Sequence, residues 1–306
     1  MPYRFALSET PQDGLRRIAR EQVRRTIARL AAETGDASTV HEMRKSLKRL
    51  KALLKLVRSG LPKQIYAREY AVVRDIARSL SGARDLDVMP VTLAALATSR
   101  DASDLVRSAI ARAQAQQMPD SDRQAHIATA ARHLKAASAR YGKLRLSNDT
   151  FTVLEQGAAR GLQLLRRQHD LAVASGEDEA YHDWRKSAQL HWRHLRLLSA
   201  TWPVLMEERT RATKCLAAVL GHDHDLSVLA SFIRSASIPR LRSADRKTIL
   251  SDIEDRQQAL RAEARACAGL LVIDTPKRFA AHLRAYHAAH REFTDLRRPH
   301  GNLFKR

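Results

Sequence analysis

The sequence predicts an all-α protein, an internally duplicated helical bundle with no strands. Three observations support this prediction: apolar residues recur at helical spacing over long segments, glycine and proline are scarce (11 and 9 of 306 residues), and one motif returns after 141 residues. We expect roughly a dozen helices in one domain over residues 1–306. Its half-repeats are expected at 1–147 and 148–306.

Proline marks the expected start of several helices, because its fixed φ suits the first helical turn. The proline pairs are Thr10-Pro11, Leu61-Pro62, Met118-Pro119, Trp202-Pro203 and Thr275-Pro276. The first helix is expected over 11–32 and its counterpart in the second half over 150–174. Thr39 and Glu42 stand at the spacing of a capping box, which predicts that the next helix starts there.

The recurring motif predicts two basic helices. His41-Glu42-Met43-Arg44-Lys45-Ser46 returns as His182-Asp183-Trp184-Arg185-Lys186-Ser187. At about 100° per residue, the first face gathers His41, Arg44, Lys45, Lys48 and Lys55, and the second His182, Arg185, Lys186, Arg193 and Arg196. The opposite faces are apolar: Met43, Leu47, Leu50, Leu54 and Val57 in the first copy, Trp184, Ala188, Leu195 and Leu198 in the second. Like charges one turn apart repel, so each face predicts contact with a polyanion.

The composition also indicates a polyanionic partner. Lysine and arginine number 54 against 33 acidic residues, a formal net charge of +21. Nucleic acid, an anionic membrane and a phosphate polymer all suit such a charge. The N-terminus lacks a signal-peptide pattern, no apolar run approaches the ~20 residues of a membrane span, and the two cysteines suit a reducing compartment. We therefore expect a cytoplasmic protein without membrane contact.

The duplication extends beyond the basic helices. Gln22 and Arg25 recur as Gln163 and Arg166, Arg84-Asp85 as His224-Asp225, and Arg132-His133-Leu134-Lys135 as Ala281-His282-Leu283-Arg284. Arg25 and Arg166 are expected to extend the basic surface, or else to solvate an exposed face. Asp85 and Asp225 could serve as general bases or metal ligands, but we expect them to form supporting salt bridges with the basic faces.

These motifs together resemble the CHAD domain, the conserved histidine α-helical domain, over nearly the whole chain. The resemblance rests on the two His-x-x-Arg-Lys helices, on the Arg84-Asp85 and His224-Asp225 turns, and on the duplication. It implies two four-helix-bundle-like halves with pseudo-twofold symmetry, whose basic helices line a central basic cleft or pore. It also implies binding of inorganic polyphosphate and localisation to polyphosphate granules. The second copy departs from the pattern at Gln189 and Leu190, where the first copy has cations, so the two halves are expected to contact the polymer unequally.

The histidines allow different interpretations. His41 and His182 lie on the cationic faces, where each could contact phosphate or instead hydrogen-bond a neighbouring helix. His191 and His194 face the core and are expected to pack there. The run from Gly221 to Asp225 alternates histidine and aspartate, but residues two apart on a helix point in nearly opposite directions, so we expect no metal site there and no cofactor.

The sequence therefore predicts a non-enzymatic polyphosphate-binding protein. A nucleic-acid-binding protein is the alternative, although only 5% of the residues are aromatic and stacking platforms are scarce. A third possibility is an enzyme of phosphate metabolism, which would need a cluster of carboxylates to bind a metal ion. The predicted binding residues are His41, Arg44, Lys45, Lys48, Arg49, Lys55, His182, Arg185, Lys186, Arg193, Arg196, Arg25 and Arg166.

Overall fold

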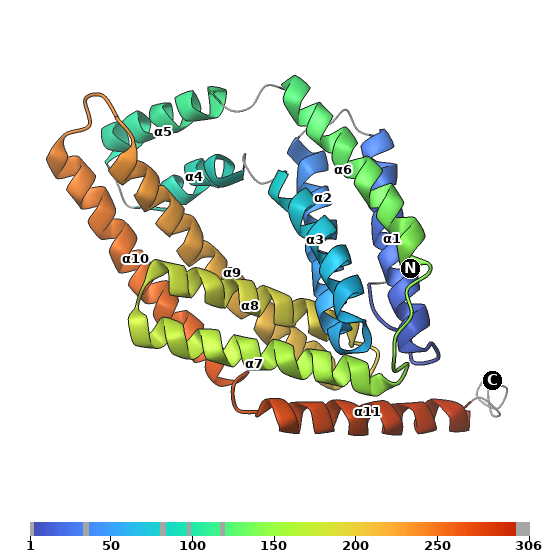
Figure 1. Cartoon of the computed structure of the whole chain (residues 1–306). Coiled ribbons are helices and arrows are strands. Elements are labelled where there is room, and N and C mark those ends of the chain that lie inside the picture. The colour runs from blue at the N-terminus through green and yellow to red at the C-terminus, as the bar shows by residue number, and fades with distance from the viewer. Residues whose placement is uncertain (1–2, 33–36, 80–83, 97–98, 117–119, 298–306) are drawn as a thin grey trace, which may run out of the picture.

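The computed structural model describes residues 3–32, 37–79, 84–96, 99–116 and 120–297, except the side chains of 29–32, 37–40, 84–85, 120–123 and 297. These ranges contain helices and no strand, as predicted (Figure 1). The first half of the chain forms α1 (Pro11–Ala32), α2 (Ala37–Leu56), the 3₁₀ turn η1 (Arg58–Gly60), α3 (Lys63–Ser79), α4 (Arg84–Ala94), α5 (Arg100–Ala115) and α6 (Asp120–Tyr141). The second half forms α7 (Phe151–Ser175), α8 (Asp178–Leu197), α9 (Pro203–Ser235), α10 (Ser243–Gly269) and α11 (Pro276–Arg297). None of the described helices is long and apolar enough to cross a membrane.

Most helix starts lie where proline predicts them. α1, α9 and α11 begin at Pro11, Pro203 and Pro276, and α3 begins directly after Pro62. Met118-Pro119 lies outside the described residues. The capping-box prediction at Thr39 is wrong, because α2 already begins at Ala37. The sequence contains another helix-start signal that the prediction did not use. An aspartate, a residue type favoured at the N-cap, directly precedes Ala37 in the sequence.

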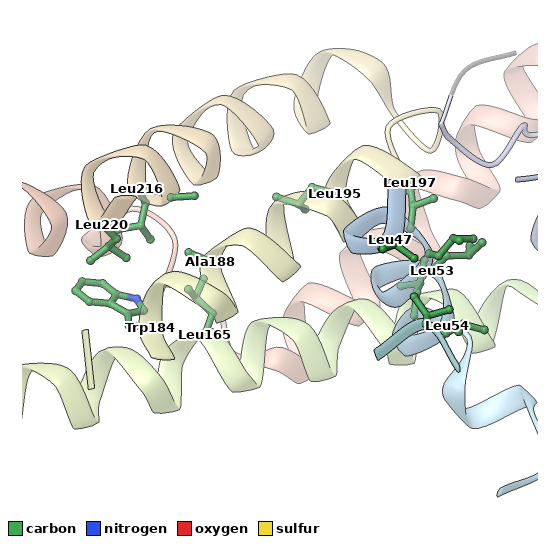
Figure 2. Close-up of a cluster of buried hydrophobic side chains, with 14 of the residues drawn as sticks. Leu47, Leu53, Leu54, Leu165, Trp184, Ala188, Leu195, Leu197, Leu216 and Leu220 are labelled. Atoms are coloured by element: carbon green, nitrogen blue, oxygen red, sulfur yellow. The ribbon is translucent and has the colours of Figure 1, made fainter. Parts of the chain in front are cut away.

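The predicted apolar faces of α2 and α8 are buried, which confirms the helical pattern. All nine residues of these faces have side chains at most 1% exposed: Met43, Leu47, Leu50, Leu54, Val57, Trp184, Ala188, Leu195 and Leu198. Figure 2 shows part of this core, with Leu47 and Leu54 of α2 and Trp184, Ala188 and Leu195 of α8 labelled. Leu165 of α7 and Leu216 and Leu220 of α9 surround the Trp184 end of α8, and the α2 leucines lie at its other end.

Helices that occupy matching places in the two predicted half-repeats make similar contacts. α1 packs on α2 and α6, and α7 packs on α8 and α11; α2 packs on α3, and α8 on α9. The halves also meet each other, since α2 contacts α7 and α8, and α4 contacts α9. These contacts bring the two motif helices, α2 and α8, together. The duplication, its pseudo-twofold axis and the boundaries of the half-repeats stay predictions.

Close approaches fix the position of α2. A Cβ added to Gly157 of α7 would lie 1.8 Å from the carbonyl oxygen of Leu56, so α7 crosses the end of α2 where only glycine fits. His194 of α8 lies 3.1 Å, through Nε2, from the carbonyl oxygen of Ala52. His191 and His194 are both fully buried, which confirms that they face the core.

Candidate anion-binding cleft

A cleft of about 550 Å³ is lined by both motif helices. α2 and α8 supply most of the lining, the N-terminal segment supplies Tyr3, and α9 supplies the rest. The lining residues are Tyr3, His41, Glu42, Lys45, Lys48, Arg49, Arg185, Gln189, Trp192, Arg193, Arg196, Lys214, Ala217 and Ala218. The structure therefore brings together seven of the predicted binding residues, among them His41, four arginines and two lysines.

The cleft carries charge of one sign. Its lining contains seven lysines and arginines and one carboxylate, Glu42, which accepts a hydrogen bond of 2.7 Å from Lys45. Two other hollows in the described part of the chain, of about 450 and 380 Å³, hold one arginine each, beside two carboxylates. The excess of positive charge therefore distinguishes this cleft and suits it to a polyanion.

Arg193 shows how closely the cations are packed. Burial, together with the neighbouring charges of Arg49, Arg196 and Arg185, lowers the pKa of Arg193 to about 10. Its Nη1 donates to the carbonyl oxygen of Gln189 at 2.6 Å. Burial and the charge of Arg196 also lower the pKa of Arg49. Guanidinium groups from α2 and α8 thus repel one another across the cleft, and a bound anion would relieve that repulsion.

Neighbouring side chains hold the arginines in place. The guanidinium of Arg49 donates from Nη1 to Oε1 of the buried Gln22 at 3.3 Å and lies 5.8 Å from the ring centre of Tyr3. The hydroxyl of Tyr3 in turn donates to the carbonyl oxygen of Arg49 at 2.8 Å. The ring of Trp192 lies 5.3 Å from the guanidinium of Arg193 and 5.4 Å from that of Arg196. Such cation–π contacts restrain long side chains that would otherwise sample many rotamers.

The other predicted binding residues do not line the cleft. Lys186 is exposed and donates to Asp183 at 2.9 Å, while the ammonium of Lys55 lies 5.7 Å from the ring centre of Tyr70. Arg25 pairs with Glu21 at 2.7 Å on α1. Arg166 donates to the carbonyl oxygens of Val272 and Asp274, so it braces the loop before α11. Arg44 is partly exposed outside the lining.

His182 makes a contact that the motif does not reveal. Its Nδ1 lies 2.9 Å from Nδ1 of His224 on α9, and the two ring centres are 4.0 Å apart. Burial and the charges of Lys186 and Arg185 lower the pKa of His182. Burial, Arg185 and His182 lower the pKa of His224 to about 3. One neutral ring therefore donates to the other beside Arg185, outside the cleft lining.

Asp223 is a carboxylate that supports the second motif helix. It is buried, and its Oδ1 accepts from Nε of Arg261 at 2.9 Å, while the same guanidinium also donates to Asp178 at the start of α8. This clamp ties α8, α9 and α10 together and fixes the second basic helix. Asp225 lies partly buried on α9, and its predicted salt bridge stays a prediction. The side chain of Asp85 lies outside the described residues.

Lys214 is the cleft cation that sequence reasoning missed. It lies on α9, and the residue 141 positions earlier is Val73, so the repeat gives no signal for it. Tyr3 and Trp192 were also missed. Trp192 directly precedes Arg193 on the same helix, and an aromatic ring within reach of two arginines was the available signal.

Comparisons with known proteins agree with this architecture. The family model of the CHAD domain matches residues 16–234. The fold is similar to the crystal structure of the CHAD domain from the plant Ricinus communis, with a TM-score of 0.62 and 16% sequence identity over 90% of this chain and 94% of that chain. A comparison with curated proteins found no match. With the family model matching well over half of its length, the chain belongs to the CHAD domain family.

Proposed function

We propose that the protein binds inorganic polyphosphate in the cleft between α2 and α8, without turning it over. The observation that carries this proposal is the lining, in which seven cations from three helices face one hollow with a single carboxylate. A linear polymer with a charge on every unit matches such a row. Arginine offers forked donors to phosphate oxygens and lysine a mobile point charge, and both are present.

The cleft suits a chain without bases better than a nucleic acid. Single-stranded nucleic acids bind on free aromatic faces, where their bases stack. The two aromatic residues that line the cleft are already engaged, since Tyr3 is 8% exposed and Trp192 lies against two guanidinium groups. Contacts to phosphate alone carry no base information. Nucleic acid is therefore expected to bind weakly and without sequence preference.

The test removes two cleft cations that come from different helices. Lys48→Ala with Arg196→Ala takes one cation from α2 and one from α8, and is expected to weaken binding of long-chain polyphosphate by roughly 10-fold to 100-fold, at about 1 kcal/mol per lost charged contact. The matched control, Lys247→Ala with Arg256→Ala, removes the same charge from exposed positions of α10 outside the cleft. Isothermal titration at constant salt measures both. Equal weakening by the two variants would show that binding depends only on net charge.

Two further measurements separate the alternatives. Duplex and single-stranded DNA, added at the same phosphate concentration, are expected not to displace polyphosphate; displacement would favour the nucleic-acid alternative. Release of orthophosphate in the presence of a divalent metal would favour an enzyme, above all if Asp225→Ala abolished it. As part of the same proposal, the protein is cytoplasmic and associates with polyphosphate granules. Fluorescence microscopy of the tagged chain in polyphosphate-rich and polyphosphate-free cells tests this localisation.

A further inference from the structure

α9 and α10 are neighbouring helices that hold both cysteines of the chain. A short connection, residues 236–242, joins them, and they pack against each other (Figure 1). Two polar contacts fix how they align: Arg261 with Asp223, and Gln257 Nε2 with Ser227 Oγ at 2.9 Å. Because a residue nearer the end of α10 meets one nearer the start of α9, the two helices are antiparallel.

This alignment places Cys215 and Cys267 at the same level. Cys215 lies eight residues before Asp223, or about 12 Å along α9, and Cys267 lies six residues beyond Arg261, or about 9 Å along α10. Because the two helices are antiparallel, both distances run in the same direction from the Asp223–Arg261 contact. Cys215 also follows the row of Asp223 and Val219 at four-residue spacing, so it shares the side of α9 that meets α10.

The local packing lets the two thiols meet. Ala264 and Ala268, which flank Cys267 on α10, are at most 1% exposed, and such small residues allow two helices to approach closely. Burial, together with the charge of the neighbouring Cys215, raises the pKa of Cys267. Cys215 is exposed, while Cys267 is partly buried against the core.

We propose that Cys215 and Cys267 form a peroxide-sensitive dithiol that oxidises to a disulfide between α9 and α10. The exposed Cys215 is the attacking thiolate: its sulfur displaces hydroxide from hydrogen peroxide, and the sulfenic acid and one water result. The Cys267 sulfur then attacks the Cys215 sulfur and displaces hydroxide, which takes up the Cys267 proton as a second water. Two thiols and one peroxide thus give one disulfide and two waters, and a thiol reductant reverses the change.

Cys215 does not line the cleft, although it lies on α9 between Lys214 and Ala218, which do. The proposal therefore does not depend on polyphosphate binding and can be tested without the polymer.

The experiment treats the reduced full-length chain with hydrogen peroxide under native conditions. Intact mass is expected to fall by the mass of two hydrogens, and both thiols should lose their reactivity towards an alkylating reagent together. Non-reducing peptide mapping should give one linked peptide pair that contains Cys215 and Cys267. Dithiothreitol should restore the original mass.

Two variants assign the order of the steps. In Cys267→Ser, Cys215 has no resolving partner, and a 1,3-dione probe should trap its sulfenic acid. In Cys215→Ser, Cys267 should react with peroxide roughly tenfold more slowly than Cys215 does in Cys267→Ser, because burial limits access to its sulfur and raises its pKa. Circular dichroism of both variants checks that the fold is intact before oxidation.

Three results would overturn the proposal. In the first, both thiols stay alkylatable while the peroxide is consumed. In the second, disulfides form between chains only. In the third, Cys215 proceeds to the sulfinic acid while Cys267 remains a free thiol in the folded wild-type protein.

Discussion

At the scale of single residues, the motif histidine of the second half has a different environment from its counterpart. His41 lines the cleft, whereas His182 pairs with His224 through their Nδ1 atoms. Paired, partly buried imidazoles surrounded by cations resist protonation. The pair is therefore a source of pH-dependent stability, in addition to the buried His194, whose pKa burial lowers to about 3.

His224→Gln is expected to reduce the loss of stability in acid. Unfolded histidine titrates near 6.5, whereas His224 in the folded chain titrates at about 3. Between these values the unfolded chain binds a proton that the folded chain does not, so the free energy of unfolding falls as the pH drops below 6.5. The slope is about 1.4 kcal/mol per pH unit for each such histidine. Urea unfolding between about pH 4.5 and about pH 7.5 should show a slope smaller by about that amount in the variant.

The exposed His222 on the same helix provides the control. His222→Gln should leave the slope as it is in the wild-type chain. A slope that is equally unchanged in His224→Gln would show that the histidine pair takes up protons freely in the folded state.

Single residues also show which features of the site the sequence could predict and which it could not. The helical projection grouped His41, Lys45 and Lys48 on one face of α2, because a face follows from the positions of side chains on one helix, and these three residues line the cleft. It could not show that Arg166 turns to backbone carbonyls, because those carbonyls belong to a loop more than a hundred residues away. It could not find Lys214, because that lysine reaches the cleft only through the packing of α9 on α8.

At the scale of elements, the position of α2 depends on its crossing with α7. Gly157 lets the two helices approach until the α7 backbone lies against the carbonyl of Leu56. Gly157→Ala should push the helices apart and lower the free energy of unfolding by about 1–3 kcal/mol or more, since the obstacle is backbone rather than a flexible side chain. Because α2 supplies five of the fourteen residues that line the cleft, affinity for polyphosphate should fall as well.

Gly221→Ala is the matched control in α9. A Cβ there meets only Nε of Arg185, at 3.9 Å, which is an ordinary contact. This change should stabilise the helix by about 0.4–1 kcal/mol, because alanine has less conformational freedom in the unfolded chain. Chemical denaturation of both variants measures the difference. Equal effects of the two substitutions would contradict a special role for the α7–α2 crossing.

The sequence predicted elements better than it predicted their crossings. Helix starts at Pro11, Pro203 and Pro276, and the buried faces of α2 and α8, follow from local rules of capping and periodicity. The start of α2 was misplaced because two competing cap signals lie within a few residues of each other. The contact between α2 and α8 depends on close approaches such as that at Gly157, which periodicity does not encode.

At the scale of the whole molecule, the net charge of +21 acts together with the local row of cations in the cleft. If each of the seven cleft cations pairs with one phosphate, binding releases a corresponding number of counterions. The logarithm of the binding constant should then fall linearly with the logarithm of salt concentration, with a slope of about −5. Titrations with long-chain polyphosphate at several potassium chloride concentrations measure this slope.

The double variant in the cleft tests whether this salt dependence arises from the cleft cations. Lys48→Ala with Arg196→Ala should reduce the magnitude of the slope by about 1.4, whereas Lys247→Ala with Arg256→Ala should leave it near the wild-type value. A slope that is the same in all three proteins would place the polymer outside the cleft. Chains too short to reach both α2 and α8 should bind with a shallower slope.

The crowding around Arg193 has a consequence for the lifetime of the protein in a cell. Four guanidinium groups held at close range weaken the folded state as long as no anion lies between them. A polymer that binds only the folded chain adds to its stability by mass action, and a protease that cuts unfolded chains then finds fewer of them. Under the proposed function, the abundance of this protein should therefore follow the cellular supply of polyphosphate, without any change in its synthesis.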